Sequence, residues 1–407
     1  MDLSLDVPVR RDLWALDPEV LFLNHGSFGA CPRPVLEFQG RLRERLEREP
    51  VRFLARELEP LLDAARVALG AFAGGDPEGL AFVTNATTGV NTVLASLRLV
   101  PEDELLTTDH AYPACRNALE AWAARAGARV VVARVPFPLE SEDDLVAPVL
   151  AAVTPRTRLA LLDHVTAPTA LVVPLARLVR ELDARGVDAL VDAAHAPGMV
   201  PLALDATGAA YTTFNAHKWL CAPKGAAALW VRADRRAGIA PLVVSLGWGA
   251  SRPDRSRFRL EFDWTGTADP SPWLAIPEAI RVLGEAVPGG WPAIVARQRA
   301  LALSARERIA HRLGIALPCP PAMVAAMASL PLPAPRPGAP AHGLSSEALE
   351  DLLFERFGIE SKIFTWESAP GGKLVRISAA LYNALGDFER LAEALATVLG
   401  LPGETDR

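Results

Sequence analysis

Six short apolar runs, separated by amphipathic stretches, are the feature of this 407-residue chain that most constrains its fold. The runs lie at residues 79–85, 103–108, 128–135, 158–165, 187–194 and 226–231, with helical patterns between them at Thr87–Leu97, Ala114–Ala126 and Leu175–Arg185. Strands that are continuously apolar are buried on both faces, and helices between them return the chain to the same edge. The pattern predicts an α/β fold with a mainly parallel sheet between helices.

Polar residues follow the ends of four of these predicted strands. They lie at Thr84–Thr88, Asp109–Tyr112, Asp163–Thr169 and Asp192–His195. Ligands of open parallel sheets bind beyond the carboxyl ends of the strands. We therefore expect the binding site at this edge of the sheet.

After about residue 275 the pattern changes and predicts a second unit. Trp291–Arg312 has the pattern of a long charged helix, and segments 344–359 and 374–383 predict a helix followed by a strand. Residues 318–340 hold many prolines and could form a disordered linker, but the run MVAAMASL at 323–330 has the character of a strand. We favour an ordered second domain.

Charge and composition exclude several classes of function. A net charge of −6 provides no basic surface for nucleic acid. Neither a signal-peptide core nor an apolar run of membrane length is found, so we expect a cytoplasmic protein without membrane partners. No GxGxxG motif or P-loop occurs, which argues against a dinucleotide or P-loop site. The cysteines are too far apart in the sequence to indicate a disulfide framework or a metal site. They are Cys31, Cys115, Cys221 and Cys319.

Lys218 lies in an unusual setting, inside the run YTTFNAHKWLCAPKGAAALWV at 211–231. An unpaired ammonium is costly to bury. The side chain therefore either extends to water or provides an amine whose chemistry suits an apolar site. Asp192 ends a predicted strand upstream, with His195 shortly after it; a lone aspartate at such a position is usually a helix cap.

The segment Thr-Asn-Ala-Thr-Thr-Gly at 84–89 ends one predicted strand and opens a helix. Backbone N–H groups and hydroxyls gather at such a junction, where an anion can bind. The alternative is that Thr87 only caps the helix. Taken alone, the segment is compatible with both.

Three motifs together resemble a known family. Asp192-Ala-Ala-His195, Asn215-Ala-His-Lys218 and Arg376-Ile-Ser-Ala-Ala-Leu-Tyr-Asn383 are similar to motifs of the class V aminotransferase-fold enzymes, which are fold type I pyridoxal 5'-phosphate (PLP) proteins. Within that family, the phrases LNHGSFG (23–29), DHAYPA (109–114), DHVTAPTALVVP (163–174) and AHKWLCAPKGAAALW (216–230) resemble isopenicillin N epimerase and its relatives. The resemblance extends from about residue 20 to residue 390.

The resemblance implies a domain organisation and an assembly. A large PLP-binding domain at 25–275 would hold a mainly parallel seven-stranded sheet between helices. A smaller α+β C-terminal domain would span 276–407, and an N-terminal segment at 1–24 would pack on it. The family's active sites are shared between subunits, which implies a homodimer.

The resemblance also assigns contacts to PLP. Lys218 would carry PLP as a Schiff base, and Asp192 would pair with the pyridine nitrogen so that the ring can accept electrons from the substrate's α-carbon. His195 would lie near the phenolic oxygen of the ring; the alternative is a buried structural histidine. The phosphate would be held by Ala86, Thr87, Thr88, Asn215 and His217, and by Gly266 and Thr267 of a second subunit, for which the alternative is an ordinary turn.

The same resemblance suggests how an amino-acid-type substrate is held. Arg376 would clamp its carboxylate as a bidentate guanidinium, or else form a structural ion pair. His110 would stack on the PLP ring and Tyr112 would share that face, although both could be core residues. Asn24 and His25 would border the substrate, or belong to a glycine-rich entry turn.

The core residues do not distinguish between epimerisation, transamination and elimination. Cysteine desulfurases of this class have a nucleophilic cysteine before the carboxylate-binding arginine; residues 346–375 contain none, which argues against a persulfide-forming desulfurase. Our first hypothesis is an epimerase-like enzyme, in which Lys218 serves one face of the α-carbon and His110, Tyr112 or water serves the other. A carbon–sulfur lyase or aminotransferase is the alternative, and a non-catalytic PLP-binding protein is a remote one.

The substrate side chain stays open. Trp248, Arg255, Arg257 and Arg259 could line a pocket for a larger or acidic group, or belong to a solvated loop.

Overall fold

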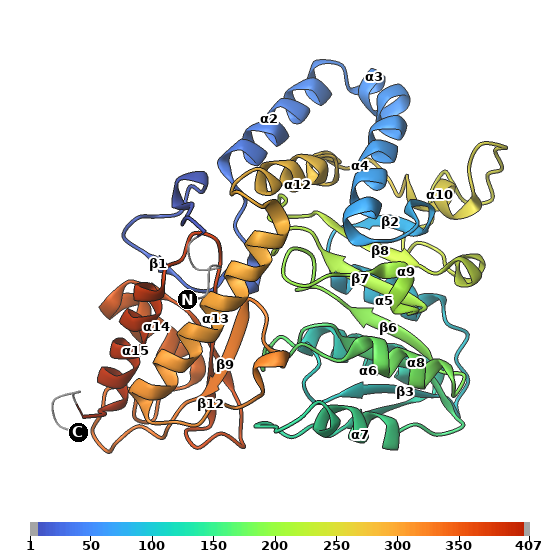
Figure 1. Ribbon diagram of the computed structural model, residues 1–407. Coiled ribbons are helices and arrows are strands. Elements are labelled where there is room, and N and C mark those ends of the chain that lie inside the picture. Colours follow the sequence, from blue (N-terminus) through green and yellow to red (C-terminus); the bar gives the residue numbers. More distant parts are fainter. Residues whose placement is uncertain (1–6, 403–407) are drawn as a thin grey trace.

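The computed structural model describes residues 7–402, and a seven-stranded sheet forms the centre of its larger part (Figure 1). The strands are β2 (Leu80–Val83), β3 (Glu104–Thr108), β4 (Arg129–Ala133), β5 (Thr157–Asp163), β6 (Asp188–Asp192), β7 (Tyr211–Asn215) and β8 (Ala227–Val231). Their order is β2-β8-β7-β6-β5-β3-β4, and β8 runs antiparallel to both of its neighbours while the other neighbouring pairs are parallel. The predicted mainly parallel α/β sheet is confirmed.

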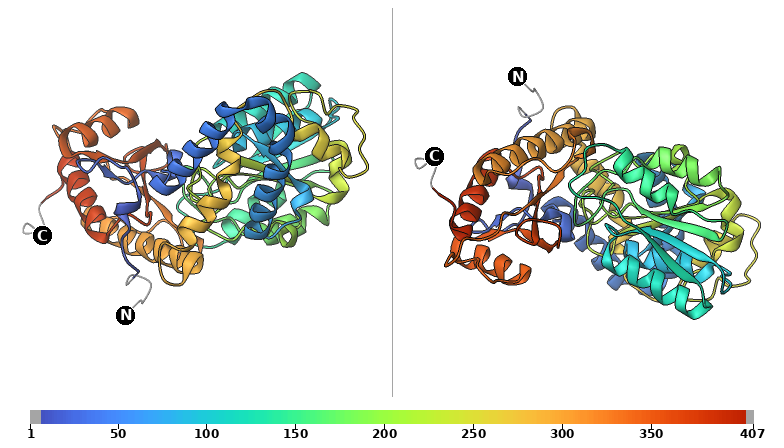
Figure 2. Two further views of the ribbon diagram at one scale, coloured as in Figure 1. Left: turned by 90° about the horizontal axis from the view of Figure 1, so that it is seen from above. Right: turned by 90° about the horizontal axis from the view of Figure 1, so that it is seen from below.

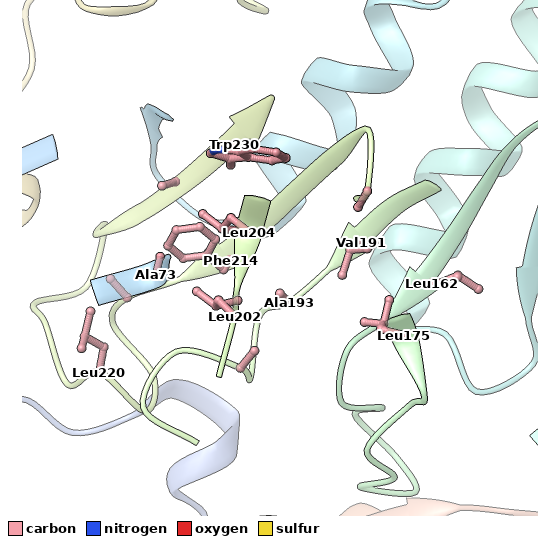
Figure 3. Close-up of a cluster of buried hydrophobic side chains, with 14 of the residues drawn as sticks. Ala73, Leu162, Leu175, Val191, Ala193, Leu202, Leu204, Phe214, Leu220 and Trp230 are labelled. Atoms are coloured by element: carbon pink, nitrogen blue, oxygen red, sulfur yellow. The ribbon is translucent and has the colours of Figure 1, made fainter. Parts of the chain in front are cut away.

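Both faces of this sheet are buried. Leu161 and Leu162 are consecutive in β5 and pack into two different apolar clusters. Because successive side chains of a strand point to opposite faces, the two clusters lie on opposite sides of the sheet. Figure 3 shows part of the cluster on one side, where Leu162, Val191, Phe214 and Trp230 come from four separate strands.

Helices cover the two faces of the sheet (Figure 2). Amphipathic spacing explains them: α8, for example, buries Leu175, Leu178, Val179 and Leu182 along one face. The helices of this region are α1 (His25–Phe28), α2 (Arg33–Arg48), α3 (Pro50–Arg52), α4 (Leu58–Ala73), α5 (Ala86–Ser96), α6 (Pro113–Ala126), α7 (Asp143–Ala151), α8 (Leu175–Asp183), α9 (Leu204–Thr207), α10 (Arg257–Phe262), α11 (Ser271–Leu274) and α12 (Ile276–Gly284). Further helical turns outside the α-helices are η2 (Arg11–Leu13), η3 (Phe53–Glu57), η4 (Pro77–Gly79) and η5 (Ala233–Gly238).

A smaller region with its own apolar cluster lies beside the sheet, in orange and red in Figure 1. Its antiparallel sheet has the order β11-β12-β9. The elements are α13 (Gly290–Leu313), η6 (Pro321–Met323), β9 (Met327–Pro331), α14 (Ser346–Phe357), β10 (Ile359–Glu360), β11 (Lys362–Thr365), β12 (Lys373–Ser378) and α15 (Leu385–Leu399). The proline-rich segment is therefore ordered around a buried strand, as predicted.

The N-terminal part of the chain contacts this smaller region. β1 (Leu21–Phe22) pairs in parallel with β10, so that Leu21 is the partner of Ile359. The N–H of Arg10 donates to the carbonyl of Leu381 at 3.1 Å. The domain boundaries at residues 24 and 275 stay predictions, and residues 1–6 of the predicted N-terminal segment lie outside the described residues.

Six of the seven central strands coincide with the predicted apolar runs, and β7 does not. That strand contains buried Thr212 and Thr213, whose polarity hides it from an apolar-run criterion. The Thr213 hydroxyl lies 3.3 Å from the carbonyl oxygen of Ala86 and 3.2 Å from that of Ala228. Gly89 of α5 lets the helix approach, because a Cβ there would lie 2.0 Å from that hydroxyl. None of the helices within residues 7–402 has both the length and the apolarity to cross a membrane.

Candidate active site

A cavity of about 780 Å³ opens at the carboxyl ends of the parallel strands. Residues that follow β2, β3, β5, β6 and β7 line it, as expected for an open α/β sheet. The structure therefore brings together segments that are far apart in the sequence. The predicted site residues that line this cavity are Ala86, Thr87, Thr88, Tyr112, Asp192, His195, Asn215, His217 and Lys218.

Lys218 lies in the turn after β7, and its amine is inside the cavity. Its Nζ is 3.4 Å from Nε2 of His195. Burial and the nearby Arg376 guanidinium lower the pKa of Lys218 to about 8, against the opposing effect of Asp192 and Cys115. A substantial fraction of neutral amine is therefore available slightly above neutral pH.

Residues 25–29 pack tightly against the turn that contains Lys218. Gly29 has a φ of +69°, and a Cβ there would lie 2.2 Å from the carbonyl oxygen of His217. His25 is buried, with Nε2 3.0 Å from the carbonyl oxygen of Lys218 and Nδ1 2.8 Å from the hydroxyl of Tyr382. Burial lowers the pKa of His25 to about 3, so the ring is neutral. His25 holds the Lys218 backbone and does not line the cavity.

Asp192 ends β6 and lines the cavity. Oδ1 accepts from the Ala194 N–H at 3.0 Å, and Oδ2 accepts from the Cys115 thiol at 3.0 Å. No arginine or lysine forms an ion pair with it among the described residues. Asp192 is therefore a buried carboxyl group that is held by two hydrogen bonds and has no protein counter-ion within the described residues.

The N-terminus of α5 borders the same cavity, and side chains already accept from two of its N–H groups, those of Ala86 and Thr88. Asn85 is the N-cap, because its side chain accepts from the Thr88 N–H at 2.8 Å. The alternative in which Thr87 caps the helix is therefore wrong. Asn215 Oδ1 accepts from the Ala86 N–H at 2.8 Å, which ties the end of β7 to this helix. A helix N-terminus with adjacent hydroxyls is suited to an anion such as phosphate.

Two neutral histidines border the cavity. Burial, with smaller effects of Lys218 and Arg376, lowers the pKa of His195 well below its ordinary value. Its Nδ1 is buried without a hydrogen-bond partner. Burial also lowers the pKa of His217 to about 4, and its Nδ1 lies 3.1 Å from the carbonyl oxygen of Ala226. The unpartnered His195 nitrogen is a group that a ligand can satisfy.

Arg376 of β12 lies directly behind the cavity wall. Nη1 donates to the carbonyl of Ala167 at 2.8 Å, and Nη2 donates to Ser27 Oγ at 3.1 Å and to Asn24 Oδ1 at 3.4 Å. Burial lowers the pKa of Arg376 to about 10, so it stays charged at neutral pH. Its Nε has no partner, and no carboxylate forms an ion pair with it within residues 7–402. The alternative of a structural ion pair is therefore not seen.

Tyr112 and His110 follow the same strand but have different surroundings. Tyr112 lines the cavity and is 44% exposed. His110 is buried outside it, with Nδ1 2.9 Å from the hydroxyl of Thr169 and Nε2 3.1 Å from the carbonyl oxygen of Val135. Its ring packs edge-on against Trp366.

Three more predicted residues lie away from the cavity. Asn24 contacts Arg376 and Glu360 instead of lining it. Gly266 and Thr267 are exposed on the loop before α11, and Gly266 adopts a φ of +122° with open space around it. Their predicted role requires a second subunit, which one chain does not test.

The arginines after residue 250 belong to an ion-pair network near α4. Arg255 pairs with Asp63 at 2.6 Å, and Arg259 pairs with Asp63 and with Glu78 at 2.6 Å. Neither lines the cavity. They instead line a separate cavity of about 280 Å³ beside α4, so a role in binding the substrate at the Lys218 cavity is not supported.

Sequence reasoning missed several residues of the site. Asp163 and Ser27 line the cavity, and Cys115 and Tyr382 contact Asp192 and His25. Asp163 and Ser27 were inside quoted motifs, so their place at a strand end or an entry loop was a usable signal. Cys115 had none, because a thiol on a helix is normally a core residue.

The donor set of this cavity fits PLP. An amine with a lowered pKa, an unpaired carboxylate, an unpartnered histidine nitrogen and a helix N-terminus match its aldehyde, ring nitrogen, ring oxygen and phosphate in kind. The cavity of about 780 Å³ is large enough for a cofactor with a small substrate.

Comparisons with known proteins agree with this chemistry. The model of the class V aminotransferase family matches residues 48–334. The chain is 38% identical over 406 residues to isopenicillin N epimerase of Streptomyces clavuligerus, covering 96% of this chain and 98% of the relative. It is 32% identical over 406 residues to a probable chloroplastic L-cysteine desulfhydrase of Arabidopsis thaliana, covering 93% of this chain and 83% of the relative.

Solved structures show the same fold. A cystine C–S lyase in complex with its product cysteine persulfide matches with a TM-score of 0.78 and 22% identity, covering 95% of this chain and 99% of the other. Such low identity supports the fold alone. The cofactor is PLP, as the family and the donor set of the cavity agree. The chain therefore belongs to the class V aminotransferase family of fold type I PLP enzymes.

Proposed function

We propose that this enzyme inverts the α-carbon of an amino acid or amino-acid derivative, in the manner of an epimerase. The observation that carries the proposal is that two groups suited to proton transfer, the Lys218 amine and the Tyr112 phenol, line one cavity. Inversion needs one group to remove the α-proton and another to return a proton on the opposite face. The 38% identity to isopenicillin N epimerase supports the same reaction class.

The residues around the cavity divide the work of holding the cofactor. When bound, PLP supplies an electron sink that allows a bond to the α-carbon to break. Asp192 would pair with the ring nitrogen, and Thr87 and His217 would hold the phosphate, because the Thr88 N–H already donates to Asn85. His195 orients the ring through its unpartnered nitrogen.

Arg376 fixes the substrate. A guanidinium has five N–H donors in a planar fork, and the buried Nε of Arg376 has no hydrogen-bond partner among the described residues. Because Arg376 is buried behind the cavity wall, Ser27 and Asn24 would have to release its Nη2 donors before a substrate carboxylate could bind there. Because Arg376 is charged at neutral pH, it pairs with an ionised carboxylate.

The two proton-transfer groups differ in their ordinary state. Lys218, with a pKa near 8, both takes and returns a proton near neutral pH. Burial, Cys115 and Asp192 raise the pKa of Tyr112, against the nearby Arg376, so the phenol keeps its proton and acts as a donor. His110 is a weaker candidate for this role, because both of its ring nitrogens are engaged outside the cavity.

The experiment that tests the proposal is Tyr112→Phe. The variant removes only the phenolic oxygen, so Lys218 still exchanges the α-hydrogen with deuterium from the solvent, while formation of the inverted product falls by about 10²-fold or more. Mass spectrometry measures the exchange and chiral chromatography measures the inversion. Equal loss of both contradicts the two-face mechanism.

Tyr211→Phe is the matched control for that experiment. Tyr211 is buried in β7 among Asp188 and Arg235 and does not line the cavity. Its ratio of exchange to inversion is expected to equal that of the unmodified enzyme.

A carbon–sulfur lyase is the second candidate, favoured by the 32% identity to an L-cysteine desulfhydrase. In that case Tyr112 protonates the leaving sulfur. Release of pyruvate, ammonia and a thiol from cysteine or a cysteine conjugate supports this reaction. A D-amino acid formed from an L-substrate, without such release, supports epimerisation instead.

The exposed turn at Gly266 and Thr267 supports a dimer with shared sites. Both residues are accessible on a loop outside the cavity, and Gly266 is surrounded by open space. We expect a second copy to receive this turn at its phosphate site. Light scattering should give twice the mass of one chain, and a monomer with full PLP affinity would contradict the shared site.

A further inference from the structure

Asp163 is a buried carboxyl group that the proposed mechanism does not use. It ends β5, and Asp192 ends the neighbouring parallel strand β6 as its partner in the register. Neighbouring strands lie about 4.8 Å apart, so the two side chains leave the same face of the sheet side by side. Asp163 is 6% exposed and Asp192 is 4% exposed. Both line the cavity.

The two carboxyl groups differ in their hydrogen bonds. Asp192 accepts from the Ala194 N–H and from the Cys115 thiol, one donor for each oxygen. Asp163 has no side-chain donor among the described residues, and the N–H of Tyr112 is the one neighbouring backbone donor outside its own residue. Donors stabilise a carboxylate, so the pair is asymmetric in favour of charge on Asp192.

No cation balances a second negative charge at this place. Neither aspartate forms an ion pair with an arginine or lysine in the part of the chain that the structure describes. The titratable groups that face Asp163 from the elements around it are Asp192 of β6, His110 and Tyr112 of the segment after β3, Cys115 of α6, and His195 and Lys218 across the cavity. Of these, Lys218 alone is cationic at neutral pH, and it has to lose that charge to react.

We propose that Asp163 and Asp192 share one proton, which resides on Asp163, so that the pair carries a single negative charge located on Asp192. Asp163 is then a positioning residue. Its neutral carboxyl lets Asp192 stay ionised in a buried site and present that charge to the ring nitrogen of PLP. Two adjacent buried carboxylates would repel each other, as in other sites where two carboxyl groups hold one proton.

The direction of the Asp163 pKa agrees with this arrangement. Burial and the charge of Asp192 raise the pKa of Asp163 well above its ordinary value. The folded protein then keeps a proton that the unfolded chain releases above about pH 4. Asp163 therefore destabilises the fold increasingly as the pH rises from about 4 towards its folded pKa, and it has no such effect below both values.

Asp163→Asn tests the inference on the protein without PLP. Asparagine copies the shape of the neutral acid and cannot ionise. The thermal midpoint of the variant at pH 8 is expected to exceed that of the unmodified protein by on the order of 2 °C, and the difference should shrink at pH 5. An equal or lower midpoint at pH 8 would overturn the proposal.

Infrared spectroscopy gives a second readout that does not depend on stability. At pH 7 the unmodified apo-protein should show a protonated carboxyl C=O band that disappears in Asp163→Asn. If the difference spectrum contains only carboxylate bands, Asp163 is ionised and the inference fails. The result is independent of whether the enzyme is an epimerase or a lyase.

Asp103→Asn is the matched control, because the Asp103 side chain has a similarly low exposed fraction but is paired with Arg158 near the surface. Burial opposes its ionisation, yet the Val100 N–H and Arg158 hold the pKa of Asp103 below its ordinary value. Its charge therefore contributes stability that is present at pH 8 and is lost as the pH falls below about 4. Asp103→Asn should lower the midpoint at pH 8 and leave the protonated band intact. A change of the same sign as in Asp163→Asn would contradict the assignment.

Discussion

The two ends of the central sheet hold buried carboxylates in different surroundings. At the amino end of β3, Arg158 donates to Asp103 at 2.6 Å, and Arg156 donates to Glu104 at 3.0 Å with Arg129 also paired to it. At the carboxyl end, Asp163 and Asp192 are as deeply buried but have no arginine or lysine partner among the described residues. The exposed fractions of these carboxyl side chains are similar, but the amino end lies near the surface, where its arginine partners are themselves more than half exposed.

The consequence appears in the charge state of each group. Burial would raise the pKa of Glu104, but hydrogen bonds from Arg129, Thr154 and Arg156 lower it below its ordinary value. At the other end, burial and Asp192 raise the pKa of Asp163. At the amino end the arginines neutralise the carboxylates, which then serve the structure. At the carboxyl end no arginine does so, and a carboxyl group remains that can bind a ligand.

The largest expected effect comes from removing the amine of the carboxyl end. Lys218→Ala should reduce α-hydrogen exchange by about 10⁴-fold, at the upper end of what one acid–base group contributes. Deuterium incorporation into the amino acid measures this. Lys224→Ala is the control, because that amine donates to the carbonyl of Gly29 outside the cavity and should retain most of the activity. Equal losses would contradict the role of Lys218.

Neutralising one carboxylate at each end of the sheet tests whether the two ends have different roles. Asp192→Asn should lower the exchange rate by about 10²–10³-fold, because it removes the carboxylate that we propose pairs with the ring nitrogen. Its unfolding free energy should change little.

Glu104→Gln should do the opposite. It weakens hydrogen bonds to a fully buried carboxylate, so the unfolding free energy should fall by about 1–3 kcal/mol while the exchange rate is unchanged. Denaturant unfolding and deuterium exchange measured on both variants decide the point. A catalytic defect in Glu104→Gln would remove the distinction between the two ends.

The pH dependence of cofactor attachment tests whether the Lys218 amine has a lowered pKa. Only the neutral amine of Lys218 reacts with the PLP aldehyde, and its pKa is about 8. The attachment rate of the apo-protein should therefore rise about 50-fold from pH 6 to pH 8 and level off above that. Stopped-flow absorbance follows it. A rate that continues to rise up to pH 10 would indicate an ordinary, exposed lysine.

The smallest expected effect concerns the thiol on Asp192. Cys115→Ala removes the donor to Oδ2 and should weaken PLP affinity about threefold to tenfold, the equivalent of one neutral hydrogen bond. Cys115→Ser keeps a donor of similar size and should lie closer to the unmodified protein. Equal affinities of both variants would show that the donor is unimportant.

Much of the fold could be predicted because its signals are local. The continuous apolar runs of β5 and β6 identify buried parallel strands, and Asp192 and Lys218 stand in short motifs. β7 was missed, since the buried Thr213 hydroxyl is satisfied by the carbonyl groups of Ala86 and Ala228, which the sequence does not show.

The parts of the site that escaped prediction depend on contacts between distant segments. His25 meets Tyr382 and the Lys218 carbonyl only after the chain folds, so its predicted place beside the substrate did not reveal the backbone it holds. Asp163 faces Asp192 through a strand register, which no spacing rule gives. Thr87 looked like a cap, but Asn85 begins the helix two residues earlier.

The central claim is that one amine at the carboxyl end of the sheet carries the cofactor. The chain has only four lysines, Lys218, Lys224, Lys362 and Lys373, so the claim has a direct test. Borohydride reduction of the PLP-loaded protein, followed by proteolysis and mass spectrometry, locates the attached cofactor. We predict the added mass on the peptide that contains Lys218 and on no other; attachment at Lys224, Lys362 or Lys373 would contradict the account.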